Sequence, residues 1–410
     1  MVKLLYNLGM LIYHFGVWVA SFWNEKASKF CKGRQGVLEY LTEKVDKNSK
    51  YVWVHAASLG EFEQGRPIIE KLRQMKPEYK VVLTFFSPSG YEVRKNYEGA
   101  DVVCYLPIDT SWSANRFLDV VNPTYAIFIK YEFWMNYISG LKRRCIPTYI
   151  VSAIFRPTQV FFKWYGAWYR KVLHCFTHLF VQNQVSLDLL SSIGVKNVSL
   201  SGDTRFDRVA DIAANSKELP IVSAFAQGSK VIVAGSSWPK DEDILCDYFN
   251  RHPGVKLILA PHEIHQSHLD DILSKLKRPY VFYTQTNEEE AAKADCLIIN
   301  CFGLLSSVYR YGDFAYIGGG FGVGIHNTLE AAVYGMPILF GPNYGRFQEA
   351  VDMVSRRAAF PVHNLSEFET IADDLLTDGS ETLRSASANA SDYVRENRGA
   401  TGKIIDEIFQ

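Results

Sequence analysis

Three residues follow the first expected strand closely enough to belong to an active site. The segment YVWVHAASLGEFEQGRP, residues 51–67, places Ser58, Gly60 and Glu61 directly after an apolar run. A carboxylate at a strand end can serve as a general base that takes the proton of an attacking hydroxyl, and partial burial beside apolar neighbours would raise its pKa. Ser58 and Glu61 also have the spacing of a helix capping box, so spacing alone leaves both interpretations open.

The glycine-rich segment YIGGGFGVGIHNTLEAAVYGMPILFGP, residues 316–342, predicts a phosphate site. An expected strand runs into five glycines, and glycines let the backbone approach a phosphate closely. Asn327 then opens a short expected helix, whose free N–H groups and dipole favour an anion. The segment matches neither GxGxxG after a first strand nor the Walker pattern, so it indicates neither NAD nor a P-loop triphosphate.

An alternative for this segment is a strand-to-helix turn that simply needs flexible residues. Asn327 would then be the N-cap and Glu330 its capping-box partner. One tight turn rarely needs five glycines, so ligand binding is the favoured interpretation. In that interpretation Glu330 accepts hydrogen bonds from ribose hydroxyls.

Asp241, Glu242 and Asp243 superficially resemble an acidic metal-binding motif. They follow Pro239 at an expected helix start, where acidic side chains complement the helix dipole. We therefore predict no metal and no cofactor. A donor substrate with one leaving phosphate can be held by backbone N–H groups and cationic side chains.

Short apolar runs alternate with helical periodicity from Tyr51 onward, which predicts an α/β fold with parallel sheets covered on both faces. A polar stretch at 213–227 interrupts the pattern, with a boundary expected near 205–229, so we predict two Rossmann-like domains facing each other across a cleft. The expected strands are 51–56, 80–86, 101–106, 124–130, 146–151 and 178–182, followed by the segments KVIVAGSS, VKLILAP, RPYVFY, ADCLIIN, DFAYIGGG and MPILFGP.

The N-terminal segment LLYNLGMLIYHFGVWVASFW is apolar over about the ~20 residues that a helix needs to cross a bilayer. Lysines and an arginine follow it, which places the main body in the cytoplasm by the positive-inside rule. We expect an anchor helix that spans the membrane or lies in its interface, and the alternative is a helix buried on the protein. The predicted divisions are 1–24 for the anchor, 25–212 and 213–395 for the two domains, and 396–410 for a helix that could pack on the first domain.

The charge and cysteine composition limits which kinds of ligand and partner the protein is expected to bind. Lys and Arg together number 44, as do Asp and Glu, so no overall field favours nucleic acid and any anionic ligand must be held by local groups. The seven cysteines are scattered without a CxxC pair or a metal-ligand spacing, which indicates reduced thiols.

Several of these segments resemble one family of enzymes. HNTLEAA and GMPILFGP are similar to the donor-nucleotide signature of glycosyltransferases with the GT-B fold, and of 3-deoxy-D-manno-octulosonic acid (Kdo) transferases in particular, although Thr328 stands where proline is usual. HAASLGE resembles that family's H(A/S)xSxGE. IKYEFWMN, SGDTRFD, VAGSSWPKDED and NCFGLLSSVY resemble further family segments, so the resemblance covers nearly the whole chain beyond the N-terminal helix.

The resemblance implies an inverting transfer of Kdo from CMP-Kdo to the tetraacylated lipid A precursor, in lipopolysaccharide biosynthesis on the cytoplasmic side of the bacterial inner membrane. Glu61 takes the role of general base. The implied acceptor-binding residues are Ser58, Gly60, Glu132 and Arg156, and the implied donor-binding residues are Arg205, Ser236, His262, Gly303, Gly319, Gly320, Gly322, His326, Asn327 and Glu330.

The chain departs from the family pattern at several of these positions. Arg205 replaces the usual lysine and trades a point cation for a planar fork. His262 lies in ProHisGlu, where the family has ProArgHis, and Leu304 replaces the glutamate after Gly303. Arg156 lies two places later than the usual arginine.

Two other functions fit part of the pattern. A nucleotide-sugar 2-epimerase of the same fold would use the glycine loop and the acidic residues but needs no membrane anchor. A non-catalytic, membrane-associated sugar-binding protein would keep the cleft but would not need Glu61.

Overall fold

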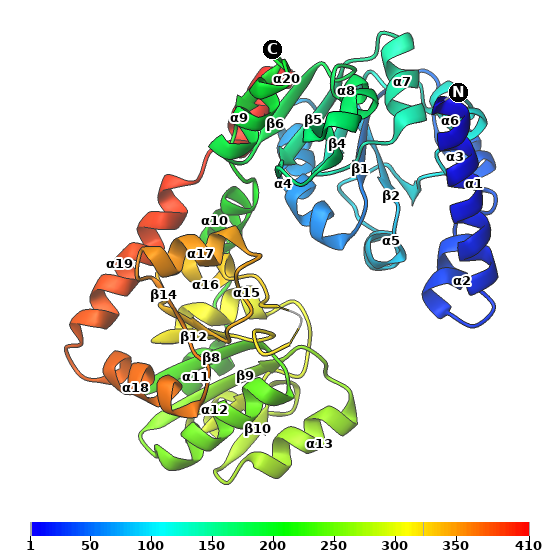
Figure 1. Cartoon of the computed structure of the whole chain (residues 1–410). Helices are drawn as coiled ribbons and strands as arrows, with labels where there is room; N and C mark the ends of the chain where they lie inside the picture. The colour runs from blue at the N-terminus through cyan, green and yellow to red at the C-terminus, as the bar shows by residue number, and fades with distance from the viewer. Residues whose placement is uncertain (1, 323, 410) are drawn as a thin grey trace. The chain divides into compact units, whose positions relative to one another are not determined.

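The computed structural model describes residues 2–322 and 324–409, and the chain divides into two compact units (Figure 1). The first unit comprises Met1–Asp207 with Arg398–Gln410, and the second comprises Arg208–Asn397. Each unit is built around its own parallel sheet with helices between successive strands, so the prediction of two parallel-sheet α/β domains is confirmed.

Seven parallel strands form the sheet of the first unit, in the order β3-β2-β1-β4-β5-β6-β7. Successive residues of β1 face opposite sides: Trp53 joins one apolar cluster, and Val52 and Val54 join the other. The six expected strands are present, and the sequence analysis missed only β7, whose three residues are too few to show a period. The strands are β1 (Lys50–Ala56), β2 (Tyr79–Phe85), β3 (Val102–Tyr105), β4 (Tyr125–Ile129), β5 (Thr148–Ala153), β6 (His178–Val181) and β7 (Val198–Leu200).

The second unit is also a seven-stranded parallel sheet, but its order, β10-β11-β9-β8-β12-β13-β14, places three strands rather than two on the first-built side of its initial strand. All six expected strand segments contain a strand, and β14 is the unexpected addition at the sheet edge. The strands are β8 (Lys230–Ser237), β9 (Val255–Pro261), β10 (Tyr280–Phe282), β11 (Cys296–Ile298), β12 (Phe314–Ile317), β13 (Ile338–Phe340) and β14 (Ala359–Pro361).

Helices connect the strands in both units. Those of the first unit are α1 (Val2–Ala20), α2 (Glu25–Lys32), α3 (Val37–Lys44), α4 (Leu59–Met75), α5 (Pro88–Arg94), α6 (Ser111–Val121), α7 (Met135–Arg143), α8 (Ala167–Leu173), α9 (Gln184–Ser192) and α20 (Ala400–Ile408), while α10 (Arg205–Ala214) runs across the division. Those of the second are α11 (Pro220–Ala226), α12 (Pro239–Arg251), α13 (Gln266–Lys275), α14 (Glu288–Lys293), α15 (Leu305–Val308), α16 (Leu329–Ala332), α17 (Gln348–Ser355), α18 (Leu365–Leu376) and α19 (Glu381–Glu396). Four 3₁₀ turns complete the chain: Val160–Phe162, Trp164–Gly166, Tyr283–Gln285 and Tyr309–Tyr311.

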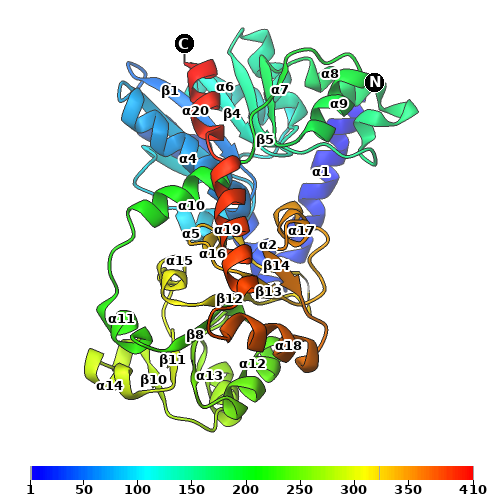
Figure 2. The same ribbon diagram turned by 90° about the vertical axis from the view of Figure 1, so that its left-hand side faces the viewer.

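The last helix belongs to the first unit. Gly399 separates α19 from α20 and is the N-cap of α20, where it takes a left-handed conformation with φ of 100°. The Asp207 carboxylate accepts hydrogen bonds from the backbone N–H groups of Gly399 and Thr401 at 2.6 and 2.7 Å. Beyond this clamp α20 packs beside α4, with Ile404, Ile405 and Ile408 in the apolar cluster on that face of the sheet (Figure 2).

The N-terminal helix does not confirm the expected anchor. Over the described residues, no helix combines the length and apolarity that crossing a bilayer requires. Two polar residues of α1 contact the first unit: the Tyr6 hydroxyl donates to Asp109 Oδ2 at 2.6 Å, and Asn7 Oδ1 accepts from the backbone N–H of Ser111 at 2.9 Å. The helix is not buried either, because most of its large apolar side chains are exposed, namely Leu4, Leu5, Leu8, Leu11, Ile12, Tyr13, Phe15 and Trp18.

Candidate active site

The order of strands indicates where each unit can bind a ligand. In both sheets the chain first builds outward on one side of the initial strand and then crosses to its other side, which makes a switch point between β1 and β4 and another between β8 and β12. Ligands of open α/β sheets bind outside the carboxyl ends of strands at such points. The two outstanding sequence segments, after β1 and after β12, both begin there.

Glu61 takes part in a capping box at the start of α4. Its Oε2 accepts a hydrogen bond from the backbone N–H of Ser58 at 2.8 Å, and the Ser58 hydroxyl donates to the same oxygen. The capping interpretation is therefore present in the structure. Among the described residues no hydrogen bond is made to Glu61 Oε1, so capping does not use up the carboxylate, and its role as a base stays a prediction.

Glu132 lies in the loop after β4 and is almost fully buried. Its Oε2 is 3.0 Å from His55 Nε2 and accepts a hydrogen bond from Trp134 Nε1 at 2.5 Å. His55 Nδ1 is 2.8 Å from the Thr84 hydroxyl of β2. This network ties the ends of β1, β2 and β4 together, so Glu132 positions the loop around the first switch point. Its predicted contact with an acceptor stays a prediction.

The two predicted arginines have different surroundings. Arg205 begins α10 in the first unit, and its guanidinium contacts the Asp203 carboxylate through Nε at 2.9 Å and Nη2 at 2.7 Å. Arg156 is exposed, and its Nη1 lies 3.3 Å from the Tyr131 hydroxyl after β4. Both remain predicted ligand contacts, and Arg205 would offer its charge to a ligand as part of an ion pair.

The glycine loop after β12 is held by one buried carboxylate. Asp241 Oδ2 accepts hydrogen bonds from the backbone N–H groups of Gly319 and Trp238 at 2.8 and 2.9 Å, and its Oδ1 accepts from the Tyr316 hydroxyl at 2.8 Å. Burial raises the pKa of Asp241, and these donors offset part of that shift. Asp241 thus links the loop after β8 to the loop after β12, a role that the helix-dipole interpretation did not include.

Packing explains most of the glycines. A Cβ on Gly318 would lie 2.2 Å from the Ser236 carbonyl oxygen, and one on Gly320 would lie 2.5 Å from the Gly341 backbone nitrogen. Gly319 and Gly324 have φ angles of 92° and 132°, which only glycine adopts easily. Gly322 is exposed and meets neither constraint. The number of glycines is therefore weaker evidence for a ligand than the sequence suggested.

Ser236 lies near the carboxyl end of β8 and Gly303 in the loop after β11, two strands that β9 separates in the second sheet. Ser236 sits at a bulge in β8 with a φ of 53°, an uncommon conformation for a residue other than glycine. Gly303 has a φ of 89° and is exposed in the loop after β11. Strained backbone of this kind clusters at functional sites, which agrees with the predicted position of a ligand.

Asn327 and Glu330 lie side by side after the glycine loop. Asn327 Nδ2 donates to Glu330 Oε1 at 2.9 Å, and Thr328 rather than Asn327 is the N-cap of α16. The helix is short, as expected, and with four residues its dipole adds little to anion binding. The predicted capping box of Asn327 with Glu330 is replaced by this side-chain contact.

His326 and His262 come together with a residue that the sequence analysis did not select. The two imidazole centroids are 4.4 Å apart, and the Trp238 ring stacks on His262 at 4.7 Å. Trp238 Nε1 donates to His326 Nε2 at 3.3 Å. The pKa of His326 is lowered to about 4, chiefly by burial and further by the neighbouring His262. Only its position within VAGSSWPKDED could have indicated Trp238.

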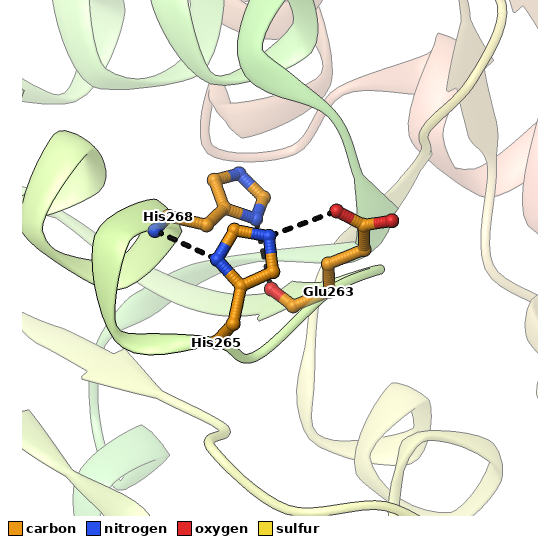
Figure 3. Close-up of side chains that lie close together, drawn as sticks. All are labelled: Glu263, His265 and His268. Carbon is orange, nitrogen blue, oxygen red and sulfur yellow. Dashed lines mark hydrogen bonds and ion pairs between the residues drawn. The ribbon is translucent and has the colours of Figure 1, made fainter.

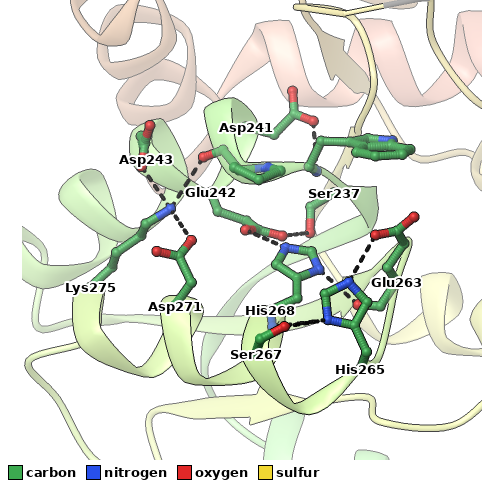
Figure 4. A network of polar contacts seen from close by, with 12 residues as sticks. Ser237, Asp241, Glu242, Asp243, Glu263, His265, Ser267, His268, Asp271 and Lys275 are labelled. Atoms are coloured by element: carbon green, nitrogen blue, oxygen red, sulfur yellow. Dashed lines mark hydrogen bonds and ion pairs between the residues drawn. The ribbon is translucent and has the colours of Figure 1, made fainter.

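A second buried network joins Ser237, Glu242 and His268 (Figure 4). The Ser237 hydroxyl donates to Glu242 Oε1 at 2.8 Å, and His268 Nε2 is 3.0 Å from Glu242 Oε2. Burial raises the pKa of Glu242, while Ser237 and His268 lower it in part. Exposed Asp243 instead pairs with Lys275 at 2.8 Å. Glu242 therefore fastens α12 and α13 to the end of β8.

Glu263, His265 and His268 form the one group of possible metal ligands among the described residues (Figure 3). Both nitrogens of His268 already have partners, since Nδ1 is 2.8 Å from the Glu263 carbonyl oxygen and Nε2 faces Glu242. His265 Nε2 lies 3.0 Å from Glu263 Oε2. A metal ion would have to displace these hydrogen bonds, so the trio fits a metal poorly.

Comparisons with known proteins agree with the motifs. Residues 31–208 match the family model described as 3-Deoxy-D-manno-octulosonic-acid transferase (kdotransferase). A 3-deoxy-D-manno-octulosonic acid transferase from Aquifex aeolicus is 29% identical over 340 residues, which cover 81% of this chain and 88% of that protein.

Solved structures show the fold that this arrangement shares. A putative UDP-N-acetylglucosamine 2-epimerase from Listeria monocytogenes has a TM-score of 0.61 at 12% identity, covering 88% of this chain and 96% of its own. A glycosyltransferase from Rickettsia africae has a TM-score of 0.57 at 12% identity, covering 88% and 98%. At these identities the structures establish the fold alone, whereas the sequence matches confirm the predicted resemblance to the Kdo transferase family of glycosyltransferases.

Proposed function

We propose that this protein transfers Kdo from CMP-Kdo to the tetraacylated lipid A precursor with inversion at the anomeric carbon. The observation that carries the proposal is the Asp241-held loop at the second switch point, where Gly322, His326 and Asn327 lie at the carboxyl end of β12. Backbone N–H groups and an imidazole can stabilise the charge that develops on a leaving phosphate. The proposal includes no metal and no cofactor.

The donor nucleotide is assigned to the second unit. Glu330, held by Asn327, would accept hydrogen bonds from the ribose hydroxyls, and Ser236, His262 and Gly303 border the same strand ends. Arg205 is a further proposed donor contact, which would offer its charge to an anionic group while it stays paired with Asp203.

The acceptor is assigned to the first unit. Glu61 would accept the proton of the attacking sugar hydroxyl through Oε1, while Ser58 keeps Oε2 fixed. Gly60, in the first turn of α4, and Arg156, in the loop after β5, are both exposed, and a phosphorylated glycolipid could contact them there.

Membrane contact is assigned to α1 and the turn that follows it. Exposed side chains such as Leu8, Phe15, Phe22 and Trp23 would enter the lipid interface while Tyr6 keeps the helix on the first unit. The enzyme would then lie on the cytoplasmic side of the bacterial inner membrane, where it would meet its lipid acceptor.

The decisive experiment incubates the purified full chain with CMP-Kdo and tetraacylated lipid A precursor and identifies the glycolipid product by mass spectrometry. We expect a mass increase of one or more Kdo units and an unchanged rate in EDTA. The 2-epimerase alternative, whose fold is the same, predicts turnover of UDP-N-acetylglucosamine without acceptor. A non-catalytic sugar-binding protein would leave both substrates unchanged.

A further inference from the structure

We propose that Trp238 is a positioning residue that fixes His326 in the tautomer with its proton on Nδ1, so that His326 presents a neutral N–H donor to the phosphate of the sugar donor. The tautomer of His326 is a property of the protein alone. The contact of His326 with a phosphate rests on the proposed function, because it assumes that the glycine loop binds the donor's phosphate.

The hydrogen bond between the two side chains has only one possible direction. An indole N–H donates and cannot accept, so Trp238 Nε1, 3.3 Å from His326 Nε2, requires a lone pair on that imidazole nitrogen. A neutral imidazole carries one proton, which must then be on Nδ1. Within residues 2–322 and 324–409, no hydrogen bond to His326 Nδ1 is described, so this N–H can serve a ligand.

Trp238 is itself held at two points. Its backbone N–H is bound by the buried Asp241 carboxylate at 2.9 Å, and its ring stacks on His262 at an interplanar angle of 25°. His326 is anchored through its backbone N–H, which donates to the Gly318 carbonyl oxygen at 3.2 Å. The indole therefore meets the imidazole from a fixed position rather than as a mobile surface side chain.

The surroundings of His326 also oppose its protonation. A proton on Nε2 would point at the indole N–H, and a charged ring would face His262 at 4.4 Å. The nearby carboxylates do not compensate, because Asp241 is bound by three protein donors and Glu330 contacts Asn327. Consistently, the pKa of His326 is lowered to about 4. His326 would thus bind phosphate as a neutral donor throughout the physiological range, and would not act as an acid.

Nuclear magnetic resonance of the full chain with ring-¹⁵N histidine tests the tautomer. The signals of His326 are assigned by their loss in His326→Gln. We expect a protonated Nδ1 and an unprotonated Nε2 from pH 8 down to pH 5. In Trp238→Phe, which keeps an aromatic ring against His262, we expect a mixture of the two neutral tautomers. Trp112→Phe, which changes an exposed indole of α6, is the matched control and should resemble the wild type.

Calorimetric titration with CMP on the same samples tests the consequence. Trp238→Phe should weaken CMP binding by about 3- to 10-fold at pH 8, the worth of one neutral hydrogen bond. An Nε2-protonated or charged His326 in the wild type at pH 7, or an unchanged tautomer in Trp238→Phe, would overturn the role of Trp238. If the tautomer behaves as expected but the wild type does not bind CMP, the proposed donor site is wrong while the hydrogen-bond assignment stands.

Discussion

Replacing Asp241 with alanine or with asparagine should distinguish what its hydrogen bonds contribute to the glycine loop from what its negative charge contributes. The carboxylate is fully buried and accepts from Trp238 N, Gly319 N and the Tyr316 hydroxyl. Asp241→Ala leaves these three donors without an acceptor. Each buried donor that loses its partner costs about 1–3 kcal/mol, and water entering the small cavity would recover part of this. We expect a loss of about 3–5 kcal/mol in the free energy of unfolding.

Asp241→Asn should be far milder. The amide oxygen can still accept from the two backbone N–H groups, and the amide N–H₂ can donate to the Tyr316 hydroxyl oxygen. Because burial raises the pKa of Asp241, its charge is unfavourable there, and a neutral amide removes that desolvation cost along with the charge assistance. The two effects oppose each other, so we expect a change within about 1 kcal/mol.

Urea denaturation and CMP titration of both variants measure these outcomes. The alanine variant should lose CMP affinity by at least about tenfold, since Gly319 is no longer held, while the asparagine variant should bind CMP nearly as the wild type does. Equal destabilisation by both substitutions would show that charge, and not the hydrogen-bond geometry, supports the loop. A loss below about 1 kcal/mol in Asp241→Ala would refute the assignment altogether.

Further predictions concern three other carboxylates. Glu61→Gln should lower the turnover rate by about 10²–10⁴-fold with CMP binding retained, and a near-normal rate in a folded variant would leave Glu61 with capping alone. Glu330→Gln should weaken CMP binding by about 1.5–3 kcal/mol per hydrogen bond with little change in melting temperature, and the reverse result would exclude the ribose contact. Burial raises the pKa of Asp109 to about 6, above its unfolded value, so native Asp109 binds protons more tightly and its contribution to stability is lost as pH rises from about 4 to about 6. Chemical denaturation of Asp109→Asn across this range should show a shallower fall than the wild type, and identical slopes would contradict the shift.

The sequence pattern predicted the sheets well because buried parallel strands consist of continuous apolar runs. All twelve expected strands were found, while β7 (VSL) and β14 (AFP) escaped because, unlike β10 within RPYVFY, neither belongs to a longer run of β-branched or aromatic residues. Helix length was harder to predict. HNTLEAA has the composition of a helix start, yet α16 ends after Ala332 because Gly335 takes a left-handed conformation with φ of 71° three residues later.

Side-chain roles that depend on tertiary contacts could not be read from spacing. Asp241 appeared as a helix-start acid, but its partner Gly319 is distant in sequence and meets it only because β8 and β12 are neighbours in the sheet. The need for glycine at position 320 also comes from a tertiary contact, because a side chain there would meet the backbone of Gly341. Residue types indicated a glycine-rich and acidic candidate site, while topology determined which of these residues support the loop.

Each α/β unit is a seven-stranded parallel sheet with a switch point beside its first strand, and proteins described as an epimerase and as a glycosyltransferase share this fold, so the fold cannot determine the chemistry. What differs between the units is the chemistry at each switch point. The first has Glu61, whose Oε1 accepts no hydrogen bond from the described residues, and a buried network that fixes the loop after β4. The second carries glycine backbone and the His326 ring, which suit a phosphate that must accept negative charge. The proposed base on the first unit and the proposed anion site on the second would meet two requirements of a displacement at an activated sugar, and an epimerase of this fold would not need the exposed apolar side chains of α1.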